Sequence, residues 1–553
     1  MAKDNMIDNL DGFLNQMKEH PTIEISKSWG NFKNLEKFNE ESQIFNRRLQ
    51  FKPFVIVYCE KEKDVEVAYK ASIDNNLPVR VRAGGHDHEG ECTGTDTILL
   101  DLSKMQGYWF KFSTLKETEV GIGPGFRFID LTSLLADEDV MIAHGTCATV
   151  GISGYTLGGG WGPWTRKYGM GCERLIGARI MNGQGVTSEV RVSEDNEVPD
   201  LLWALRGGGG MSYGIVTEFI FKAFKLPCEM HRFVVEINPY KNSTSDELIE
   251  QMPTLQALKK WEGLIEWSQN KELTGTNLKI NAIHQEKGHE IDENVHNNCA
   301  MFGYWEGDLE SVEAFIKKHF PEQYEGGFYK IEDAVGACYK ETKYGHNLMS
   351  AWDRESNFRT LKRMTKKGLL QGTPLQPDED EPAPHKITSR LVNEKGLDHN
   401  NENGYMELLQ SLSSHLVLEG NRAHGLFTYV TLGAIQGEFY GDPKNRGTEN
   451  KAFPYADCQY TIQYQCWWNT TEDECTQGQD NFVYDRTNRA LDWIEASRDA
   501  KISNTHGAFI SFKDSSIPTE IYFDKSYSKL KSIKESNLVQ DEYNHLRTRK
   551  TII

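Results

Sequence analysis

Glycine gathers in three short loops of this chain, and these loops limit the possible folds more than any other feature of the sequence. The chain has 48 glycines in 553 residues. One loop holds Gly84-Gly85, a second runs over residues 145–162, and a third contains four consecutive glycines at 207–210. Ordering glycine is entropically costly, so such density is expected where something approaches the backbone closely. A large flat ligand is the natural interpretation, because four glycines far exceed what a helix C-cap needs.

Length and charge narrow the class of protein. A chain of 553 residues is too long for one compact core and favours two or more units. The formal charge of −19 argues against binding to nucleic acid or to an anionic membrane surface, and no apolar run approaches the roughly 18 residues of a membrane-spanning helix. The first thirty residues lack the apolar segment of a secretory signal, so we expect a cytoplasmic protein. The ten cysteines show neither CxxC pairs nor disulfide-scaffold density, and we predict no metal site.

Short apolar runs predict an α+β fold that opens with a β-α-β unit. Strands are expected at 54–58 and 78–82, around a helix at 64–73. Further strands are expected at 97–102, 119–122, 176–181 and 213–221, with a helix at 201–205. Glycine becomes sparse after Pro227, which suggests a boundary there. We therefore expect one domain over 1–226 with its core at about 48–226, a second over 227–500, and a C-terminal segment over 501–553. The charged stretch within 343–386 is interpreted as a solvated loop or a partner-binding surface.

The first glycine loop follows a strand and reads R-A-G-G-H-D at 82–87. A glycine pair permits positive φ and lets backbone N–H groups converge on an anion such as a pyrophosphate. The same residues could also form only a tight turn, with His86 as a polar cap. This motif alone therefore leaves both readings open.

The other two loops add specific sequences. The second begins G-T-C-A-T-V-G at 145–151 and continues through Gly154 to Gly162, and the third joins D-L-L-W-A-L-R at 200–206 to Y-G-I-V-T at 213–217. In this order and spacing the three loops resemble the FAD-binding domain of the vanillyl-alcohol-oxidase superfamily (PCMH type), specifically its berberine-bridge-enzyme-like branch. The resemblance covers about 51–226 and is weaker toward the C-terminus. It implies a two-domain fold in which an antiparallel sheet of the substrate domain covers the flavin.

The resemblance implies FAD held by two covalent bonds. His86 stands where the family's histidine bonds the flavin 8α-methyl group, and Cys147 stands where a cysteine bonds flavin C6. Neutral imidazole and thiolate are suitable nucleophiles for these positions, although Cys147 could also be an inert buried thiol. The residues expected at the cofactor are Arg82, Ala83, Gly84, Gly85, His86, Asp87, Gly145, Cys147, Thr149, Val150, Gly151, Gly154, Gly158, Gly159, Gly160, Gly162, Gly214, Ile215 and Val216.

Val150 bears on the electron acceptor. In the family, the residue three positions after the cysteine controls oxygen access to the reduced flavin. Valine there resembles the oxidases, whereas a bulkier leucine is associated with dehydrogenases. The resemblance therefore implies that O2 reoxidises the flavin.

The catalytic base is harder to predict. The strand at 459–466 alternates, with Thr461 and Gln463 on a polar face and Tyr464 on the opposite one. The resemblance implies that the polar face looks at the flavin. Its usual glutamate and tyrosine bases align with Thr461 and Phe512, which cannot accept a proton usefully. The catalytic candidates are therefore Tyr155, Tyr464 and Gln463, unless water or the substrate itself takes the proton.

These features predict an oxidase that transfers a hydride from a small-molecule metabolite to FAD, with O2 reduced to hydrogen peroxide. An alcohol, an amine or a ring C–H in secondary metabolism would suit it. The alternatives are a carbohydrate oxidase that forms a lactone, with Trp467-Trp468 stacking on a sugar, and a flavin-binding protein without catalysis. A nicotinamide-dependent dehydrogenase is disfavoured, since no G-x-G-x-x-G follows the first strand.

Overall fold

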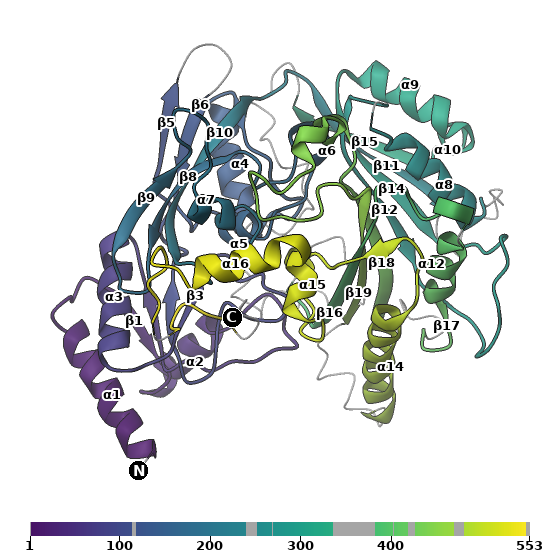
Figure 1. Ribbon diagram of the computed structural model, residues 1–553. Helices are drawn as coiled ribbons and strands as arrows, with labels where there is room; N and C mark the ends of the chain where they lie inside the picture. Colours follow the sequence, from purple (N-terminus) through teal and green to yellow (C-terminus); the bar gives the residue numbers. More distant parts are fainter. Residues whose placement is uncertain are drawn as a thin grey trace.

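The structure is a computed structural model, and it describes residues 2–112, 118–238, 252–267, 269–335, 382–401, 403–417, 426–468, 480–542 and 544–548. Figure 1 shows two α+β units side by side, with the earlier part of the chain on the left and a large sheet on the right. Two large hydrophobic cores correspond to these units, one around Phe219 and one around Trp261. The two-domain α+β fold predicted from the sequence is thus observed, while most of the charged 343–386 stretch lies outside the described residues.

The chain opens with a small sheet of order β1-β2-β4-β3. Its strands are β1 (Glu24–Lys27), β2 (Val55–Tyr58), β3 (Val79–Arg82) and β4 (Ile98–Asp101). Both β2 and β3 pair parallel to β4, and helix α3 (Glu62–Asp74) connects β2 to β3, so the predicted β-α-β opening is confirmed. The apolar runs of β2 and β4 are buried on both faces, as expected for parallel strands.

A second sheet completes this unit, with the order β5-β6-β10-β8-β9 and β7 paired to β10. Its strands are β5 (Tyr108–Phe112), β6 (Thr118–Ile122), β7 (Val140–Met141), β8 (Leu175–Met181), β9 (Thr187–Arg191) and β10 (Ile215–Lys225). The helices of the unit, besides α3, are α1 (Ala2–Met17), α2 (Phe32–Glu41), α4 (Phe128–Asp137), α5 (Ile152–Leu157), α6 (Thr165–Tyr168) and α7 (Asp200–Leu205). The glycine loops connect these elements, and the loop at 145–151 leads directly into α5.

The second unit is built on an antiparallel sheet of order β15-β11-β14-β12-β18-β19-β16-β20. The strands are β11 (Met230–Asn238), β12 (Leu273–Asn281), β14 (Cys299–Glu306), β15 (Tyr329–Val335), β16 (His385–Val392), β18 (Leu426–Ala434), β19 (Tyr460–Trp468) and β20 (Thr505–His506). A small parallel pair joins β13 (Ile283–His284) to β17 (Ser413–Ser414). The helices are α8 (Thr254–Leu264), α9 (Leu309–His319), α10 (Pro321–Glu325), α12 (Gly404–Leu412), α13 (Glu438–Gly441) and α14 (Asp480–Asp499). Figure 1 shows α8, α9 and α12 on the side of this sheet away from the first unit.

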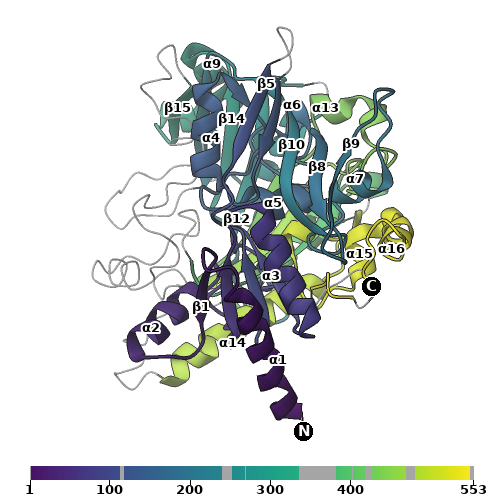
Figure 2. The same ribbon diagram turned by 90° about the vertical axis from the view of Figure 1, so that its left-hand side faces the viewer.

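The C-terminal segment crosses back to the first unit. Helix α15 (Thr519–Phe523) is followed by α16 (Tyr527–Lys534), and α16 lies near α7 in Figures 1 and 2. Leu530 packs against the backbone at Gly208, and the carbonyl of Val539 accepts a hydrogen bond of 2.8 Å from the Gly183 amide. The last part of the chain thereby supports the third glycine loop from behind. The exact domain boundaries, including the one at Pro227, stay a prediction.

Candidate active site

A cavity of about 410 Å³ lies between the glycine loops and one face of the large sheet. Many glycines of the first unit contribute bare backbone to its wall, namely Gly84, Gly85, Gly145, Gly151, Gly154, Gly158, Gly209, Gly210 and Gly214. Strands β11, β12, β14, β18 and β19 supply the opposite wall with side chains such as Arg232, Lys279, Tyr429 and Gln463. The first unit thus contributes much bare backbone to the wall of the cavity, and the sheet of the second unit contributes side chains.

The first two glycine loops abut through their backbones. A Cβ added to Gly84 would lie 2.5 Å from the amide nitrogen of Gly151, and a Cβ added to Gly151 would lie 2.8 Å from the amide nitrogen of Gly84. Both distances are below any real Cβ contact, so neither position has room for a side chain. This close approach brings the loops that carry His86 and Cys147 together at one cavity.

His86 is half-buried in the cavity wall, between an aromatic ring and a hydroxyl group. Its ring stacks on Phe45 with centroids 3.9 Å apart, and its Nε2 lies 2.8 Å from Oγ1 of Thr149. Burial, together with the positive charge of Arg127 and the neighbouring His88 ring, holds the pKa of His86 well below its ordinary value. The imidazole is therefore neutral and nucleophilic at physiological pH. Cys147, from the second loop, is half-buried in the same wall.

Comparisons with known proteins show which proteins this chain is similar to. Residues 53–191 match the family model described as "FAD binding domain". A glucooligosaccharide oxidase from Sarocladium strictum is 31% identical over 228 residues, which cover 41% of this chain and 43% of that protein. Berberine bridge enzyme-like 24 from Arabidopsis thaliana is 26% identical over 328 residues, or 56% of each chain. Among solved structures, BBE-like 28 from Arabidopsis thaliana aligns with a TM-score of 0.68 at 18% identity, over 98% of this chain and 99% of that one.

Residues 53–191 thus form an FAD-binding domain, and the chain is similar to berberine-bridge-enzyme-like proteins. A solved glucooligosaccharide oxidase from Acremonium strictum, described as carrying 6-S-cysteinyl, 8α-N1-histidyl FAD, also has this fold, with a TM-score of 0.69 at 17% identity over 98% of this chain and 99% of that one. The sequence matches to the first curated relatives span less than half of the length of those relatives.

The residues of this site fit FAD. Gly154 has open space where a Cβ would stand, so a ligand can lie directly against its backbone. Gly85 adopts a φ of +76°, which turns the first loop around the cavity. Ala83, Asp87, Val150, Ile215 and Val216 also line the cavity, so their role at the cofactor stays a prediction. Across the part of the chain that the structure describes, no group of three or more metal-ligating side chains gathers and no helix is long and apolar enough to span a membrane.

Five residues predicted to contact the cofactor lie outside the cavity wall. Thr149 reaches it only through its contact with His86. The guanidinium of Arg82 is fully buried in an ion pair with Asp101, 2.6 Å away, and so joins β3 to β4 beneath the loop. Its assignment as a direct cofactor ligand is wrong, because a buried charge needs its partner and is held away from the cavity.

The remaining three are glycines that make room for protein atoms. A Cβ on Gly159 would meet Phe453, one on Gly160 would meet the ring of Tyr155, and one on Gly162 would lie 1.7 Å from the carbonyl oxygen of His144. Gly159 and Gly160 also have positive φ, at +106° and +78°. Sequence reasoning assigned all of these glycines to the ligand, whereas tight packing of the loop on itself explains them.

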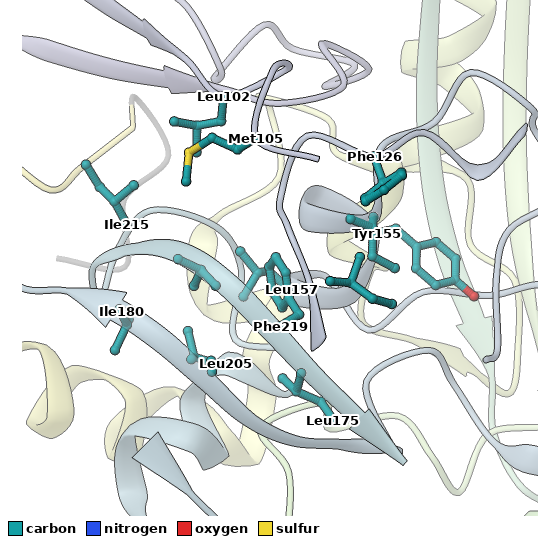
Figure 3. Close-up of a cluster of buried hydrophobic side chains, with 14 of the residues drawn as sticks. Leu102, Met105, Phe126, Tyr155, Leu157, Leu175, Ile180, Leu205, Ile215 and Phe219 are labelled. Carbon is teal, nitrogen blue, oxygen red and sulfur yellow. The ribbon is translucent and has the colours of Figure 1, made fainter. Parts of the chain in front are cut away.

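Tyr155 is poorly suited to be the catalytic base. Its ring belongs to the cluster of apolar side chains of the first core (Figure 3). It lies edge-on to Phe128, with ring centroids 4.8 Å apart. Burial and the neighbouring Cys172 raise the pKa of Tyr155 well above its ordinary value, and its hydroxyl has no hydrogen-bond partner within the described ranges. A phenol that ionises only with difficulty cannot accept a substrate proton near neutral pH.

The predicted alternation of β19 is observed, and it separates the other two candidates. Thr461, Gln463 and Gln465 face the cavity. Tyr464 is buried in the second core, and its hydroxyl forms a hydrogen bond of 2.7 Å with the hydroxyl of Ser411. Tyr464 is therefore wrong as a catalytic residue, since it points away from the site. Gln463 stays a candidate for orienting substrate.

Several cavity residues were missed by the sequence reasoning. The hydroxyl of Tyr429 donates to Oε1 of Gln465 at 3.0 Å, and the Lys279 ammonium lies 4.4 Å from the Tyr429 ring centroid. Strands β12 and β18 pair with each other and bring these two side chains together. Alternating polar residues in β18, such as Tyr429 and Thr431, were the available signal for this wall.

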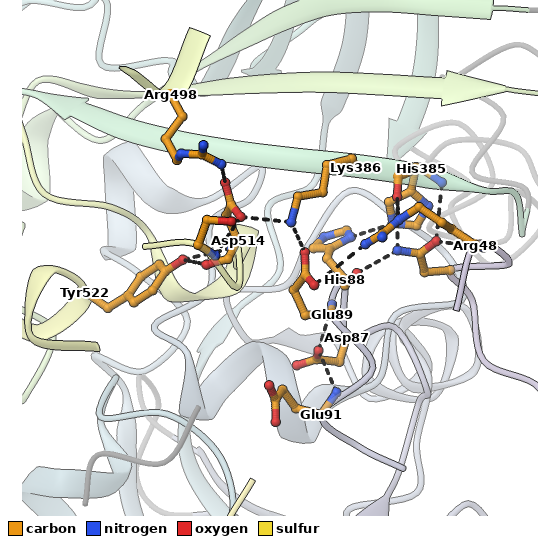
Figure 4. Close-up of polar contacts among 12 residues, drawn as sticks. Arg48, Asp87, His88, Glu89, Glu91, His385, Lys386, Arg498, Asp514 and Tyr522 are labelled. Carbon is orange, nitrogen blue, oxygen red and sulfur yellow. Dashed lines mark hydrogen bonds and ion pairs between the residues drawn. The ribbon is translucent and has the colours of Figure 1, made fainter. Parts of the chain in front are cut away.

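A buried charge network connects the first glycine loop to the second unit (Figure 4). The Lys386 ammonium pairs with Glu89 and, at 2.8 Å, with Asp514, whose carboxylate also meets Arg498 at 3.4 Å. Burial opposes ionisation of Asp514, but Lys386 and nearby hydrogen bonds lower its pKa overall. The network fixes the loop after His86 against β16 and the C-terminal segment.

Proposed function

We propose that this chain is an FAD-dependent oxidase that holds its flavin through His86 and Cys147 and takes a hydride from a small-molecule substrate. The observation that carries the proposal is the abutment of the two glycine loops, which brings a neutral imidazole and a thiol to one cavity. The match to an FAD-binding domain and the oxidases among the relatives support it.

The contact with Thr149 supports a particular linkage at His86. Because Nε2 of His86 is engaged by the Thr149 hydroxyl, Nδ1 is the nitrogen we assign to the bond with the 8α carbon. The 8α-N1-histidyl linkage of the structurally similar glucooligosaccharide oxidase agrees with this choice. Cys147 would supply the second bond, to flavin C6.

Bound FAD supplies the redox chemistry, since it accepts a hydride from carbon and returns the electrons to O2, which leaves as hydrogen peroxide. The protein orients the substrate and restricts access. Gln463 and Thr461 present an amide and a hydroxyl from β19, and the Tyr429 hydroxyl is held by Gln465 beside them. Val150 lines the same cavity and would set oxygen access.

A carbohydrate substrate is the second candidate. The glucooligosaccharide oxidase relative favours it, and so does a wall of amides and hydroxyls that suits a polyol. The Trp467-Trp468 pair does not offer a sugar platform, because Trp467 stacks on His385 while Trp468 lies in the core on the other face of β19. Of these two residues, Trp467 lines the cavity and Trp468 does not.

A turnover screen tests the proposal. The purified yellow protein would be mixed anaerobically with oligosaccharides, alcohols, amines and nitrogen heterocycles, and bleaching of the flavin followed by absorbance. We expect bleaching by at least one class and hydrogen peroxide on admission of air. A flavin that no compound reduces, but that reoxidises promptly after photoreduction, would instead indicate a flavin-binding protein without catalysis.

A further inference from the structure

Two histidines from distant parts of the chain meet at the cavity wall. His88 follows His86 in the first loop, and His385 is the first residue of β16. Nδ1 of His88 lies 2.9 Å from Nε2 of His385, although 297 residues separate them in sequence. Figure 4 shows both rings next to the charge network around Lys386. The proposed function uses neither histidine.

The partners of the two rings determine where their protons lie. Nδ1 of His385 lies 2.9 Å from the carbonyl oxygen of Ala383, which can only accept, so this nitrogen carries the hydrogen. Burial and the neighbouring His88 hold the pKa of His385 well below its ordinary value, so the ring is neutral and its Nε2 is an acceptor. His88 must then donate from Nδ1, which leaves the lone pair of His88 on Nε2.

This lone pair belongs to a residue of the cavity wall. The residue is half-buried and lines the cavity, and none of the residues that the structure describes hydrogen bonds to its Nε2. Burial lowers the pKa of His88 to about 4, so its ring is unprotonated at neutral pH. The charges around it are themselves paired, with Asp87 held by Lys513 at 3.0 Å and Glu89 held by Lys386.

His88 belongs to the same loop as His86, the residue proposed to bond the flavin, and not to the strands of the large sheet. It stands two residues after His86 on the same loop. Phe45 stacks on His86 and also packs at 5.9 Å against His385, while Trp467 stacks on His385 at 3.9 Å. These rings hold the three imidazoles in one cluster at the place where the flavin methyl group must lie if His86 bonds to it.

Asp87, the neighbouring carboxylate on the same loop, is a poorer proton acceptor than His88. Although burial opposes it, Lys513 and the backbone amide of Glu91 lower the pKa of Asp87, and its Oδ1 accepts from the amides of Glu89 and Glu91 at 3.0 and 2.9 Å. Its carboxylate is thus occupied by an ion pair and two amides. The His88 ring lines the cavity and offers a lone pair that is unprotonated and has no hydrogen-bond partner among the described residues.

We propose that His88 is the proton acceptor in the reaction that joins His86 to the flavin 8α carbon, with His385 as the residue that positions it. This rests on the proposed function. In the reaction the methyl carbon loses one proton to Nε2 of His88 and bonds to a nitrogen of His86, and the His86 ring gives up its N–H proton. The two electrons released pass through the flavin to O2, which takes up two protons and leaves as hydrogen peroxide.

The alternative is that the two histidines only pin the loop to β16. Substitution of His88 by asparagine separates these roles, because the asparagine amide can still donate to His385 but cannot accept the proton usefully. His144→Asn is the matched control, since His144 is a fully buried histidine beside the second loop and outside the cavity wall. Both variants would cost stability, while only the first removes the base.

The experiment measures each flavin linkage separately, by peptide mass spectrometry of protein expressed and purified in air. In the parent, His86 and Cys147 should both carry flavin. In His88→Asn the His86 linkage should form at least about tenfold more slowly, as for loss of a general base, while the Cys147 linkage persists. In His88→Gly, added imidazole should restore the His86 linkage.

His385→Phe, which keeps the stacking on Trp467 but removes the acceptor, should slow the His86 linkage by a smaller factor. A His88→Asn protein with the parent's linkage at His86 would overturn the assignment, and so would equal losses in His88→Asn and His144→Asn. A parent protein without flavin on His86 would overturn the proposed function as well, which distinguishes the two failures.

Discussion

Substitution of Gly84 or Gly151 by alanine tests the geometry on which the site depends. Ordinary Cβ contacts begin at 3.4 Å, so a methyl group on Gly84 would lie about 0.9 Å too close to the Gly151 amide, and one on Gly151 about 0.6 Å too close to the Gly84 amide. The obstacle is backbone in both cases, so the loops must move apart. Overpacking of this kind costs about 1–3 kcal/mol, and Gly84→Ala should be the more damaging.

The separation should also disturb the attachment of flavin, since it moves His86 away from Cys147. We expect each variant to melt at a lower temperature and to carry less covalent flavin, measured as absorbance retained by acid-precipitated protein. The double variant should cost less than the sum of the two, because one movement relieves both contacts. Gly263→Ala in α8, where a Cβ has open space, serves as the control and should be neutral or stabilising. Unchanged melting and full covalent flavin in Gly84→Ala would refute the argument.

Three further predictions follow from single side chains. Val150→Leu should slow reoxidation of the reduced flavin in air while hardly affecting its reduction, and equal reoxidation rates in stopped-flow would remove Val150 from oxygen access. Tyr155→Phe should leave flavin reduction within about twofold of the parent, because the phenol is a poor base at neutral pH and base loss would cost 10² or more; a tenfold slower reduction would restore Tyr155 as the base. Lys386→Met should destabilise the protein by about 3 kcal/mol at pH 7. Since the pKa of Asp514 is lowered on folding, the stabilisation exists above its unfolded pKa and is lost as pH falls, so the two melting curves should converge below about pH 4.

Local patterns were sufficient for much of the fold. Apolar and β-branched runs predicted β2, β3 and β4, and helix α3 was predicted between β2 and β3. The period of two in β19 predicted that Thr461 and Gln463 share a face, and this face lines the cavity. These features depend on neighbours within a few residues, where hydrophobic periodicity is informative. The short strand β1 was missed, because Glu24–Lys27 has no continuous apolar run.

The site was predictable in its motifs but not in its packing. The loops of His86 and Cys147 do meet at one cavity, whereas Gly160 and Gly162 were assigned to the ligand, although they accommodate Tyr155 and His144. A glycine motif indicates that a side chain does not fit at that position. The sequence alone does not show whether a ligand or other protein atoms occupy the space.

Contacts between distant segments could not be predicted. The pairing of His88 with His385 joins residues 297 positions apart, through the register of β16 in a sheet whose order is far from sequential. A single sequence carries no signal for such a contact. For the same reason Tyr429 was not recognised as part of the cavity wall, since it reaches the cavity only because β18 pairs with both β12 and β19.

Mass spectrometry of the flavin peptides tests the central claim most directly. The protein would be denatured in acid, digested, and its yellow fractions sequenced, with His86→Ala and Cys147→Ala treated in parallel. The account predicts that the parent keeps its flavin through denaturation, on a pair of peptides containing His86 and Cys147, and that each variant keeps one link. Quantitative release of flavin from the parent by acid would contradict it.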